Sequence, residues 1–200
     1  MELDTRPRLT PYMPWHAPSL HKLVTKNAGD LRRDFPDVPE RYSSTFTALR
    51  SVCRAMRNDA VFPYLIQNRT GKLIPRDEAT YKEWVRGDEQ LLGQLWTPVD
   101  TKAAGVATLI EGDDDPYIAY WVDKDARGTG IGSFAAMCLT NIARARGHDR
   151  VSAYVRPENI ASVSVVESLG FRAVGSAAYA DLGDNVAADR QKFTLDLSAT

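Results

Sequence analysis

Residues 127–133 carry the residue types and spacing that favour binding of an anion. They read Arg127-Gly128-Thr129-Gly130-Ile131-Gly132-Ser133, with a glycine at every second position after the arginine. An apolar run precedes this segment and an amphipathic run follows it, which predicts a turn from a strand into a helix. Glycines there let the backbone approach a ligand closely, and the first amides of a helix point toward it with the positive end of the helix dipole. The segment therefore predicts a phosphate site.

Two common phosphate-binding loops fit this segment poorly. No lysine follows the last glycine, which excludes the GxxxxGK[ST] loop of P-loop proteins. A dinucleotide fold would place G-x-G-x-x-G near its first strand, whereas these glycines are spaced G-x-G-x-G and lie well past the middle of the chain. Arg156, after the next expected strand, is the one feature that favours NADP, so an NADP-binding oxidoreductase stays a weaker alternative.

The composition favours one globular domain. The chain has 200 residues, of which 44% are hydrophobic and 26% charged. Its 25 basic and 26 acidic residues give a net charge of −1, which disfavours nucleic acid or an acidic membrane as partner. Cys53 and Cys138 lie far apart without metal-ligand spacing, so we expect neither a disulfide nor a metal site. With a charged start and no apolar run of about 18 residues, the sequence predicts a soluble cytoplasmic protein.

The elements that must position the glycine-rich turn form an α+β pattern. Before residue 100 we expect a helix after Pro18 capped by Ser19 and ending near Gly29, a helix over 39–57, a strand over 61–67, and a turn over 68–71 into a strand over 72–75. Beyond residue 90 we expect strands over 91–96, 104–110 and 117–122, a helix over 132–146, a strand over 151–155, a helix over 159–169, and strands over 171–180 and 191–197. Short connections predict antiparallel neighbours within a mixed sheet.

Three segments, in this order, resemble the GNAT superfamily of acetyltransferases. Arg127-x-x-Gly130-x-Gly132 resembles its Arg/Gln-x-x-Gly-x-Gly/Ala signature. Tyr117-Ile118-Ala119-Tyr120-Trp121-Val122 resembles its fourth strand, and Asn159-x-x-Ser162 through Leu169-Gly170-Phe171 resembles its terminal motif. Within the superfamily they are most similar to the RimJ/RimL type, which acetylates protein N-termini and related amines. The resemblance covers about residues 104–175 and is vague before residue 91.

This resemblance implies a fold and a domain layout. The sheet would be mixed, mostly antiparallel and twisted, flanked by helices and splayed between its fourth and fifth strands. Residues 1–200 would form a single domain, with acceptor-side helices in 1–100, an acetyl-CoA core in 104–175 and a C-terminal hairpin in 176–200.

The resemblance also implies acetyl-CoA as co-substrate, without a metal. The pyrophosphate would lie on the amides of residues 128–133, and the pantetheine would extend along the strand that ends at Val122 as an added strand. Amides near Trp121 and Val122 would stabilise the oxyanion, and Asn159 would hydrogen-bond the pantetheine. The expected cofactor-binding residues are Trp121, Val122, Arg127, Gly128, Thr129, Gly130, Ile131, Gly132, Ser133 and Asn159.

Two positions depart from the family pattern and define the catalytic candidates. The tyrosine that many members use to protonate the CoA thiolate corresponds to Val166 here. Ser162 shares a helical face with Asn159 and Val166, so it is expected to act in place of that phenol, although capping or packing fits it equally. The glutamate that RimJ/RimL relatives often carry corresponds to Tyr117, which is the second candidate.

No residue is assigned as the general base. The acidic residues of the 111–115 turn fit a solvated turn better than a base. His16 and His21 are minor candidates in the acceptor-side segment, His148 is expected at a helix end, and Cys138 is expected to be inert.

The resulting expectation is an N-acetyltransferase that acetylates a primary amine, either of a protein N-terminus or of a small molecule. A homodimer is the assembly that the family resemblance favours. Without a strong base, such a site favours α-amines, whose pKa of about 8 lies below the roughly 10.4 of lysine. The alternative is a CoA-binding module without turnover, favoured by Val166 and the absent glutamate.

Overall fold

The computed structural model describes residues 8–11, 13, 16–35, 37–69, 101–112, 114–178 and 189–198. Within these residues, one sheet has the strand order β1-β2-β3-β4-β5-β7-β6. Its strands are β1 Arg8–Pro11, β2 Val61–Arg69, β3 Thr101–Ile110, β4 Tyr117–Val122, β5 Arg150–Val155, β6 Arg172–Ala178 and β7 Asp189–Asp196. The helices are α1 Ala17–Asp34, α2 Val38–Arg41, α3 Thr45–Met56, the short 3-10 helix η2 Lys124–Ala126, α6 Ile131–Ala145 and α7 Ile160–Ser168. None of these helices is both long and apolar enough to span a membrane.

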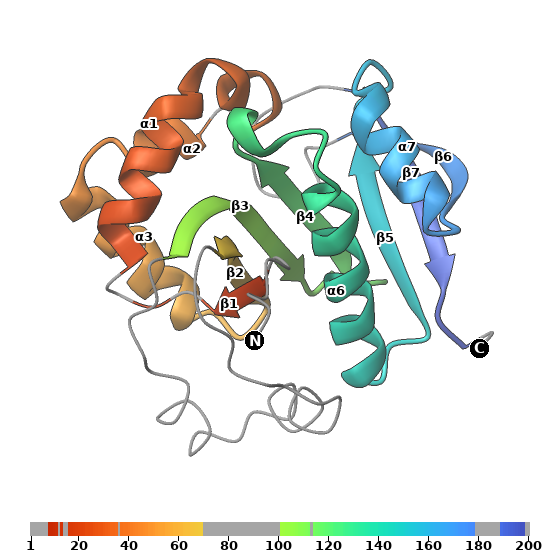
Figure 1. Cartoon of the computed structure of the whole chain (residues 1–200). Helices are drawn as coiled ribbons and strands as arrows, with labels where there is room; N and C mark the ends of the chain where they lie inside the picture. The colour runs from red at the N-terminus through yellow and green to blue at the C-terminus, as the bar shows by residue number, and fades with distance from the viewer. Residues whose placement is uncertain are drawn as a thin grey trace, which may run out of the picture.

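The sheet is antiparallel except between β4 and β5. These two strands run parallel and pair only at Tyr117 with Ser152 and at Ile118 with Ala153. Toward the end of β4 they are no longer paired, and Figure 1 shows α6 packed in front of this part of the sheet. The predicted mixed, mostly antiparallel sheet with helices on its faces is confirmed.

Side chains that alternate along the strands bury the two faces of the sheet separately. On one face, Ile66 and Leu109 pack with Leu139 of α6 in the larger core cluster. On the other face, Leu65 packs with Leu20 of α1 and Val52 of α3. Because Leu65 and Ile66 are neighbours in β2, their side chains point to opposite faces. Helices α6 and α7 therefore cover one face, and α1 and α3 cover the other.

Helix α1 differs from its prediction at both ends. It begins at Ala17 rather than after Pro18, and its N-cap is His16, whose Nδ1 accepts a hydrogen bond from the Met13 amide at 3.2 Å. Ser19 lies within the first turn, so its predicted capping role is wrong. The helix also continues past Gly29 to Asp34 because Leu31, only 3% exposed, is buried. This burial outweighs the roughly 1 kcal/mol that a glycine costs inside a helix.

The single helix predicted over 39–57 is two helices. Ser44 interrupts it and starts α3, since its Oγ accepts from the Thr47 amide at 3.1 Å while the Thr47 Oγ1 accepts from the Ser44 amide at 2.9 Å. This reciprocal capping satisfies amides that a continuous helix would otherwise bond. The apolar stripe expected on this helix is only partly buried: Val52 is 0% exposed, whereas Phe46 is 68% exposed.

The other strand and helix predictions agree with the structure within a few residues, apart from the turn expected over 68–71. There β2 continues to Arg69, which pairs with Thr101. The strands predicted over 72–75 and 91–96 lie outside the described residues.

Candidate active site

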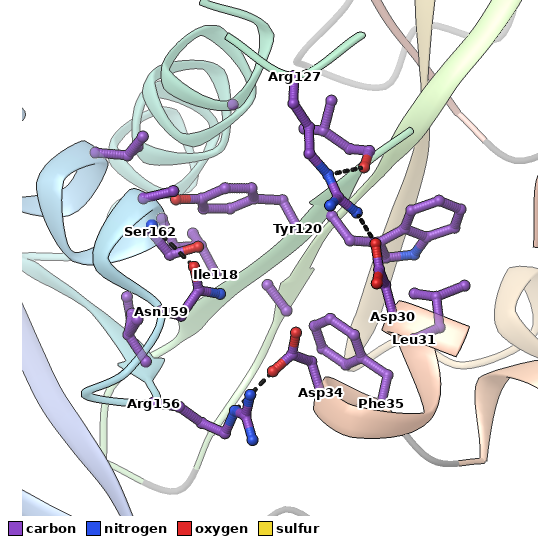
Figure 2. Close-up of a pocket in the computed structure, with 18 of the residues that line it drawn as sticks. Asp30, Leu31, Asp34, Phe35, Ile118, Tyr120, Arg127, Arg156, Asn159 and Ser162 are labelled. Atoms are coloured by element: carbon purple, nitrogen blue, oxygen red, sulfur yellow. Dashed lines mark hydrogen bonds and ion pairs between the residues drawn. The ribbon is translucent and has the colours of Figure 1, made fainter. Parts of the chain in front are cut away.

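A cavity of about 420 Å³ lies where β4 and β5 diverge. Its lining also includes η2 and the turn after it, the first turns of α6 and α7, the C-terminal half of α1 and Arg190 of β7 (Figure 2). Beyond Ile118, the edge of β4 that faces β5 has no strand partner among the described residues. An extended ligand with amide groups could pair with that edge as an added strand does.

The glycine-rich turn closes one end of this cavity. Gly128 and Gly130 have φ values of 74° and 82°, which is the left-handed region that favours glycine. A Cβ at either position would have no neighbour within 4 Å, so the requirement for glycine is conformational rather than steric. Gly130 is the N-cap of α6, and the first amides of a helix have no acceptor within it. These amides lie at the cavity and can bind an anion.

The structure brings eight of the ten predicted cofactor-binding residues to the cavity. They are Trp121, Val122, Arg127, Gly128, Gly130, Gly132, Ser133 and Asn159. Of the other two, the Ile131 side chain is 3% exposed and belongs to the core, and the Thr129 hydroxyl donates to the Ala126 carbonyl at 2.6 Å.

Arg127 crosses the side of the cavity between β4 and α1. Its Nε donates to the Val122 carbonyl at 3.3 Å, and its Nη2 lies 2.7 Å from Asp30 Oδ2 (Figure 2). Both charged side chains are about half exposed, at 51% and 47%. The guanidinium therefore stands beside the predicted phosphate site, held to α1.

Asn159 and Ser162 lie together at the start of α7. The Asn159 Oδ1 accepts a hydrogen bond from the Ser162 amide at 3.2 Å, which caps the helix. Both residues line the cavity, whereas Val166 is 0% exposed in the core. The cap is thus supplied by Asn159, which leaves the Ser162 hydroxyl for another partner.

Tyr120 of β4 lines the same cavity, although its side chain was not among the predicted site residues. Its ring lies beside the first turn of α6, where a Cβ on Gly132 would be 3.6 Å from the Tyr120 Cε2. Its hydroxyl points toward Ser162 (Figure 2) and is buried without a hydrogen bond of ordinary geometry to any described residue. Burial raises the pKa of Tyr120 to about 12, against the opposite effect of the nearby Ser162 hydroxyl. The resemblance of Tyr120-Trp121-Val122 to the family's fourth strand could have drawn attention to Tyr120.

Tyr117, the predicted catalytic residue of β4, lies where β4 and β5 are still paired. It is 9% exposed, lines the cavity and packs edge-on against Tyr154, with ring centroids 5.6 Å apart. Tyr117 therefore forms part of the wall at the closed end of the splay.

Two carboxylates reach the cavity from α1, and sequence reasoning missed both because it ended this helix near Gly29. Besides Asp30, the Asp34 Oδ1 lies 2.7 Å from the Arg156 Nε, and each of these two side chains is 17% exposed. Arg190 of β7, 5% exposed, donates to the Asp34 carbonyl at 2.7 Å. Asp30 and Asp34 are four residues apart, and this spacing could have indicated that both lie on one face of a longer helix. Arg156, the one support for NADP, is engaged in an ion pair.

The end of β4 holds α1 in this position. Asp123 is 2% exposed, with its Oδ2 2.6 Å from the Lys26 Nζ and its Oδ1 accepting from the Asn27 Nδ2 at 3.1 Å. The Asn27 Oδ1 in turn accepts from the Lys124 amide at 3.0 Å. Burial raises the pKa of Asp123, but the hydrogen bonds and charge of Lys26 and Asn27 outweigh it, so the net pKa is lowered.

The other acids and histidines of the predictions lie away from the cavity. Glu111 contacts Arg146 and His148, with a distance of 3.2 Å from its Oε2 to the His148 Nε2. His21 Nδ1 lies 2.7 Å from the Tyr42 carbonyl, and His16 starts α1. Neither Asp114 nor Asp115 belongs to the cavity lining, and Asp113 is outside the described residues.

Within the described ranges of the chain, the cysteines and potential metal ligands are not gathered into a site. Both cysteines are free. Burial raises the pKa of the Cys138 thiol to about 11, so this thiol is poorly nucleophilic near neutral pH. Among the described residues, no three His, Cys, Asp or Glu side chains are grouped to hold a metal ion.

The sequence profile of the acetyltransferase (GNAT) domain matches residues 44–172, which is more than half of the chain. The chain belongs to the GNAT acetyltransferase family. The solved structures below match the predicted RimJ/RimL resemblance at the level of the fold. The sheet topology differs from the doubly wound sheet that the oxidoreductase alternative requires.

The GNAT domain is similar to a mycothiol acetyltransferase of Thermobispora bispora, with 40% identity over 83 residues. That match covers 40% of this chain and 26% of the relative, so the chain matches about a quarter of the curated protein's length.

Solved structures show the likeness over nearly the whole fold. The RimL ribosomal L7/L12 α-N-protein acetyltransferase in complex with CoA has a TM-score of 0.70 at 22% identity, covering 100% of this chain and 98% of the other. RimJ of Mycobacterium smegmatis in complex with CoA disulfide has a TM-score of 0.67 at 19% identity, covering 95% of this chain and 81% of the other. At these identities the likeness shows a shared fold.

Proposed function

We propose that this GNAT domain transfers the acetyl group of acetyl-CoA to a primary amine. The divergence of β4 and β5 beside the N-terminus of α6 is the observation that carries the proposal. A pantetheine arm has two amides that can pair with the free edge of β4, and a pyrophosphate fits the amides that follow Gly130. Arg127 adds a positive charge at that end of the cavity.

In this proposal the chain holds the thioester between β4 and α7. Of the two predicted amides, that of Val122 faces the open edge of β4 and stabilises the oxyanion that forms when the amine attacks the carbonyl. The Trp121 amide faces β3, as does that of Asp123, which donates to the Ala104 carbonyl at 2.7 Å. Asn159 keeps its side-chain Nδ2 for the pantetheine because its Oδ1 already caps α7. Tyr117 forms the wall at the closed end of the splay, with its predicted catalytic role untested.

The acceptor enters from the α1 side, and an amine of low pKa is the class we favour. Each of the two carboxylates among the described lining residues, Asp30 and Asp34, is paired with an arginine. A site without a strong free base acts best on amines that are neutral already. At pH 7 about one α-amine in ten is neutral, against fewer than roughly one lysine in a thousand. The acceptor is therefore a protein N-terminal α-amine or a comparable small-molecule amine.

The names of the relatives support both acceptor classes. One is an acetyltransferase of the α-amine of ribosomal protein L7/L12, and the other is named for mycothiol. We further propose that the chain acts in the cytoplasm, where its free cysteines fit, and that it forms a homodimer, as the family resemblance favours. Sedimentation velocity tests the assembly.

Binding and turnover are tested separately. Calorimetry with acetyl-CoA measures binding, and a dissociation constant above about 100 µM would overturn the proposal. A thiol-release assay then compares a peptide with a free N-terminus, the same peptide blocked at its N-terminus with one free lysine, a polyamine and a free amino acid. We expect the free N-terminus or another amine of low pKa to react fastest.

One observation, the burial of Val166, favours the alternative of a CoA-binding module without turnover. Val166, at the position of the family's phenol, is buried in the core and offers no proton. Tight binding of acetyl-CoA without acetylation of any amine in the panel would favour this alternative.

A further inference from the structure

The departing CoA sulfur needs a proton that α7 supplies only through Ser162. Val166 is 0% exposed, and the residues of α7 that line the cavity are Ala161, Ser162 and Val165. A serine hydroxyl by itself is a weak acid. If the chain catalyses transfer, a second group beside Ser162 is therefore expected to assist.

Tyr120 brings a phenol to that place from the opposite side of the splay. Its side chain extends from β4 toward α7, and its hydroxyl points to Ser162 (Figure 2). That hydroxyl is buried and makes no hydrogen bond of ordinary geometry with a described residue. With Ser162 close by but no well-formed hydrogen bond, the hydroxyl keeps part of the cost of burying an unsatisfied polar group. Such a group at a cavity is suited to a ligand atom that accepts its hydrogen bond.

We propose that Tyr120 is the proton donor to the departing CoA thiolate, with Ser162 as its neighbour in a short relay. This inference rests on the proposed acetyl transfer and names the residue that completes it. The phenol thus comes from β4 rather than from α7.

The proton and electron balance closes without a further reactant. The amine nitrogen forms a bond to the carbonyl carbon, and the carbon–sulfur bond breaks with its electron pair on sulfur. The sulfur takes the proton of the Tyr120 hydroxyl. The nitrogen gives up one proton as the amide forms, and this proton returns to the phenolate through Ser162 or solvent.

The acidity of the two groups is compatible with this exchange. Because burial raises the pKa of Tyr120 to about 12, its phenol is protonated at neutral pH and acts as a donor rather than as a base. A thiolate that forms in the cavity is less well solvated than in water, which favours its protonation.

The decisive variant is Tyr120→Phe, which keeps the ring and removes the hydroxyl. We expect acetyl-CoA affinity and thermal stability to stay near wild type while kcat falls about 100-fold, as general acids contribute roughly that much or more. Tyr64→Phe is the matched control. Tyr64 is a partly buried tyrosine of β2 with a pKa also raised to about 12, and it lies outside the cavity lining.

The Tyr120→Phe/Ser162→Ala double variant separates a relay from two independent effects. Groups that act as a unit give non-additive losses, so we expect the double variant to lose little more than the worse single variant. Independent roles would multiply the two losses. If no amine in the panel reacts, slow hydrolysis of acetyl-CoA serves as the readout, because it expels the same thiolate.

The outcomes distinguish this inference from the proposed function. A wild-type chain that binds no acetyl-CoA, or neither acetylates an amine nor hydrolyses acetyl-CoA, refutes transfer and the inference with it. An active wild type with Tyr120→Phe within threefold of its kcat overturns the inference alone. Equal losses of acetyl-CoA affinity and rate would also overturn it, because the hydroxyl would then hold the ligand instead of donating a proton.

Discussion

Lys26 and Asp123 lie 2.6 Å apart, nitrogen to oxygen, and join the middle of α1 to the end of β4. Asn27 strengthens the same junction through its own hydrogen bond to Asp123. Two turns farther along α1, Asp34 reaches the cavity, so this junction fixes the position of the α1 wall of the cavity relative to the β4 edge.

Asp123→Asn is expected to destabilise the protein by about 1–3 kcal/mol, since it weakens buried hydrogen bonds to a charged group. Urea unfolding measures the loss, with the exposed Asp114→Asn as control. Because the folded pKa of Asp123 is lowered, its stabilisation is present above the ordinary value of 3.8 and is lost as the pH falls below it. The difference between wild type and variant should therefore shrink toward pH 3, and a constant difference would contradict the assignment.

Gly130→Glu is expected to abolish acetyl-CoA binding, because a carboxylate would occupy the phosphate end of the cavity. The matched control is Gly147→Glu at the other end of α6, where φ is 88° and a Cβ would also meet open space. Both variants carry similar backbone strain of about 1–2 kcal/mol. Calorimetry should show binding lost only in Gly130→Glu. Unchanged affinity there would refute the phosphate site.

Asp34→Asn is expected to raise the KM for the acceptor amine about tenfold, which corresponds to a lost contact of about 1.4 kcal/mol. The affinity for acetyl-CoA should stay within twofold of wild type. Asp37→Asn, at an exposed aspartate paired with Arg41, is the control. Steady-state kinetics with varied acceptor give the comparison. A change confined to the acetyl-CoA affinity would place Asp34 on the other substrate.

Stability is expected to decline above pH 10. Burial raises the folded pKa of Tyr64 and Tyr120 from 10.0 to about 12, because the ionised phenol is poorly solvated in the fold. The unfolded chain therefore ionises first, so stability is unaffected below pH 10 and falls as the pH rises toward 12. The full loss for each phenol is about 2.7 kcal/mol. Urea unfolding at pH 9 and pH 11 should show a smaller decline for Tyr64→Phe than for wild type. Equal declines would mean that Tyr64 titrates normally in the folded state.

Sequence patterns predicted the elements around the glycine-rich turn well. The strand expected over 117–122 matches β4, and the helix expected over 132–146 matches α6 within one residue at each end. These elements are signalled locally, by an apolar strand, by glycines that permit positive φ, and by an amphipathic repeat. Eight of the ten cofactor-binding candidates, which the family resemblance implied, lie at one cavity.

The features that the patterns missed depend on contacts distant in the sequence. Gly29 would end α1 on propensity alone, but burial of Leu31 carries the helix on to Asp34. Tyr120 has no special spacing within β4, and its proposed role depends on α7, which places Ser162 next to its hydroxyl. Such partners cannot be derived from a one-dimensional pattern.

Only two residue pairs join β4 to β5, so this junction is a weak seam in the sheet. On one side lie β1 to β4, and on the other lie β5, β7 and β6, with α6 packed against both β4 and β5. A ligand bound between β4 and β5 would connect the two parts of the sheet and couple their unfolding. Amide hydrogen exchange should then slow on both sides of the seam when acetyl-CoA binds, so that the substrate is for a time part of the architecture that holds it.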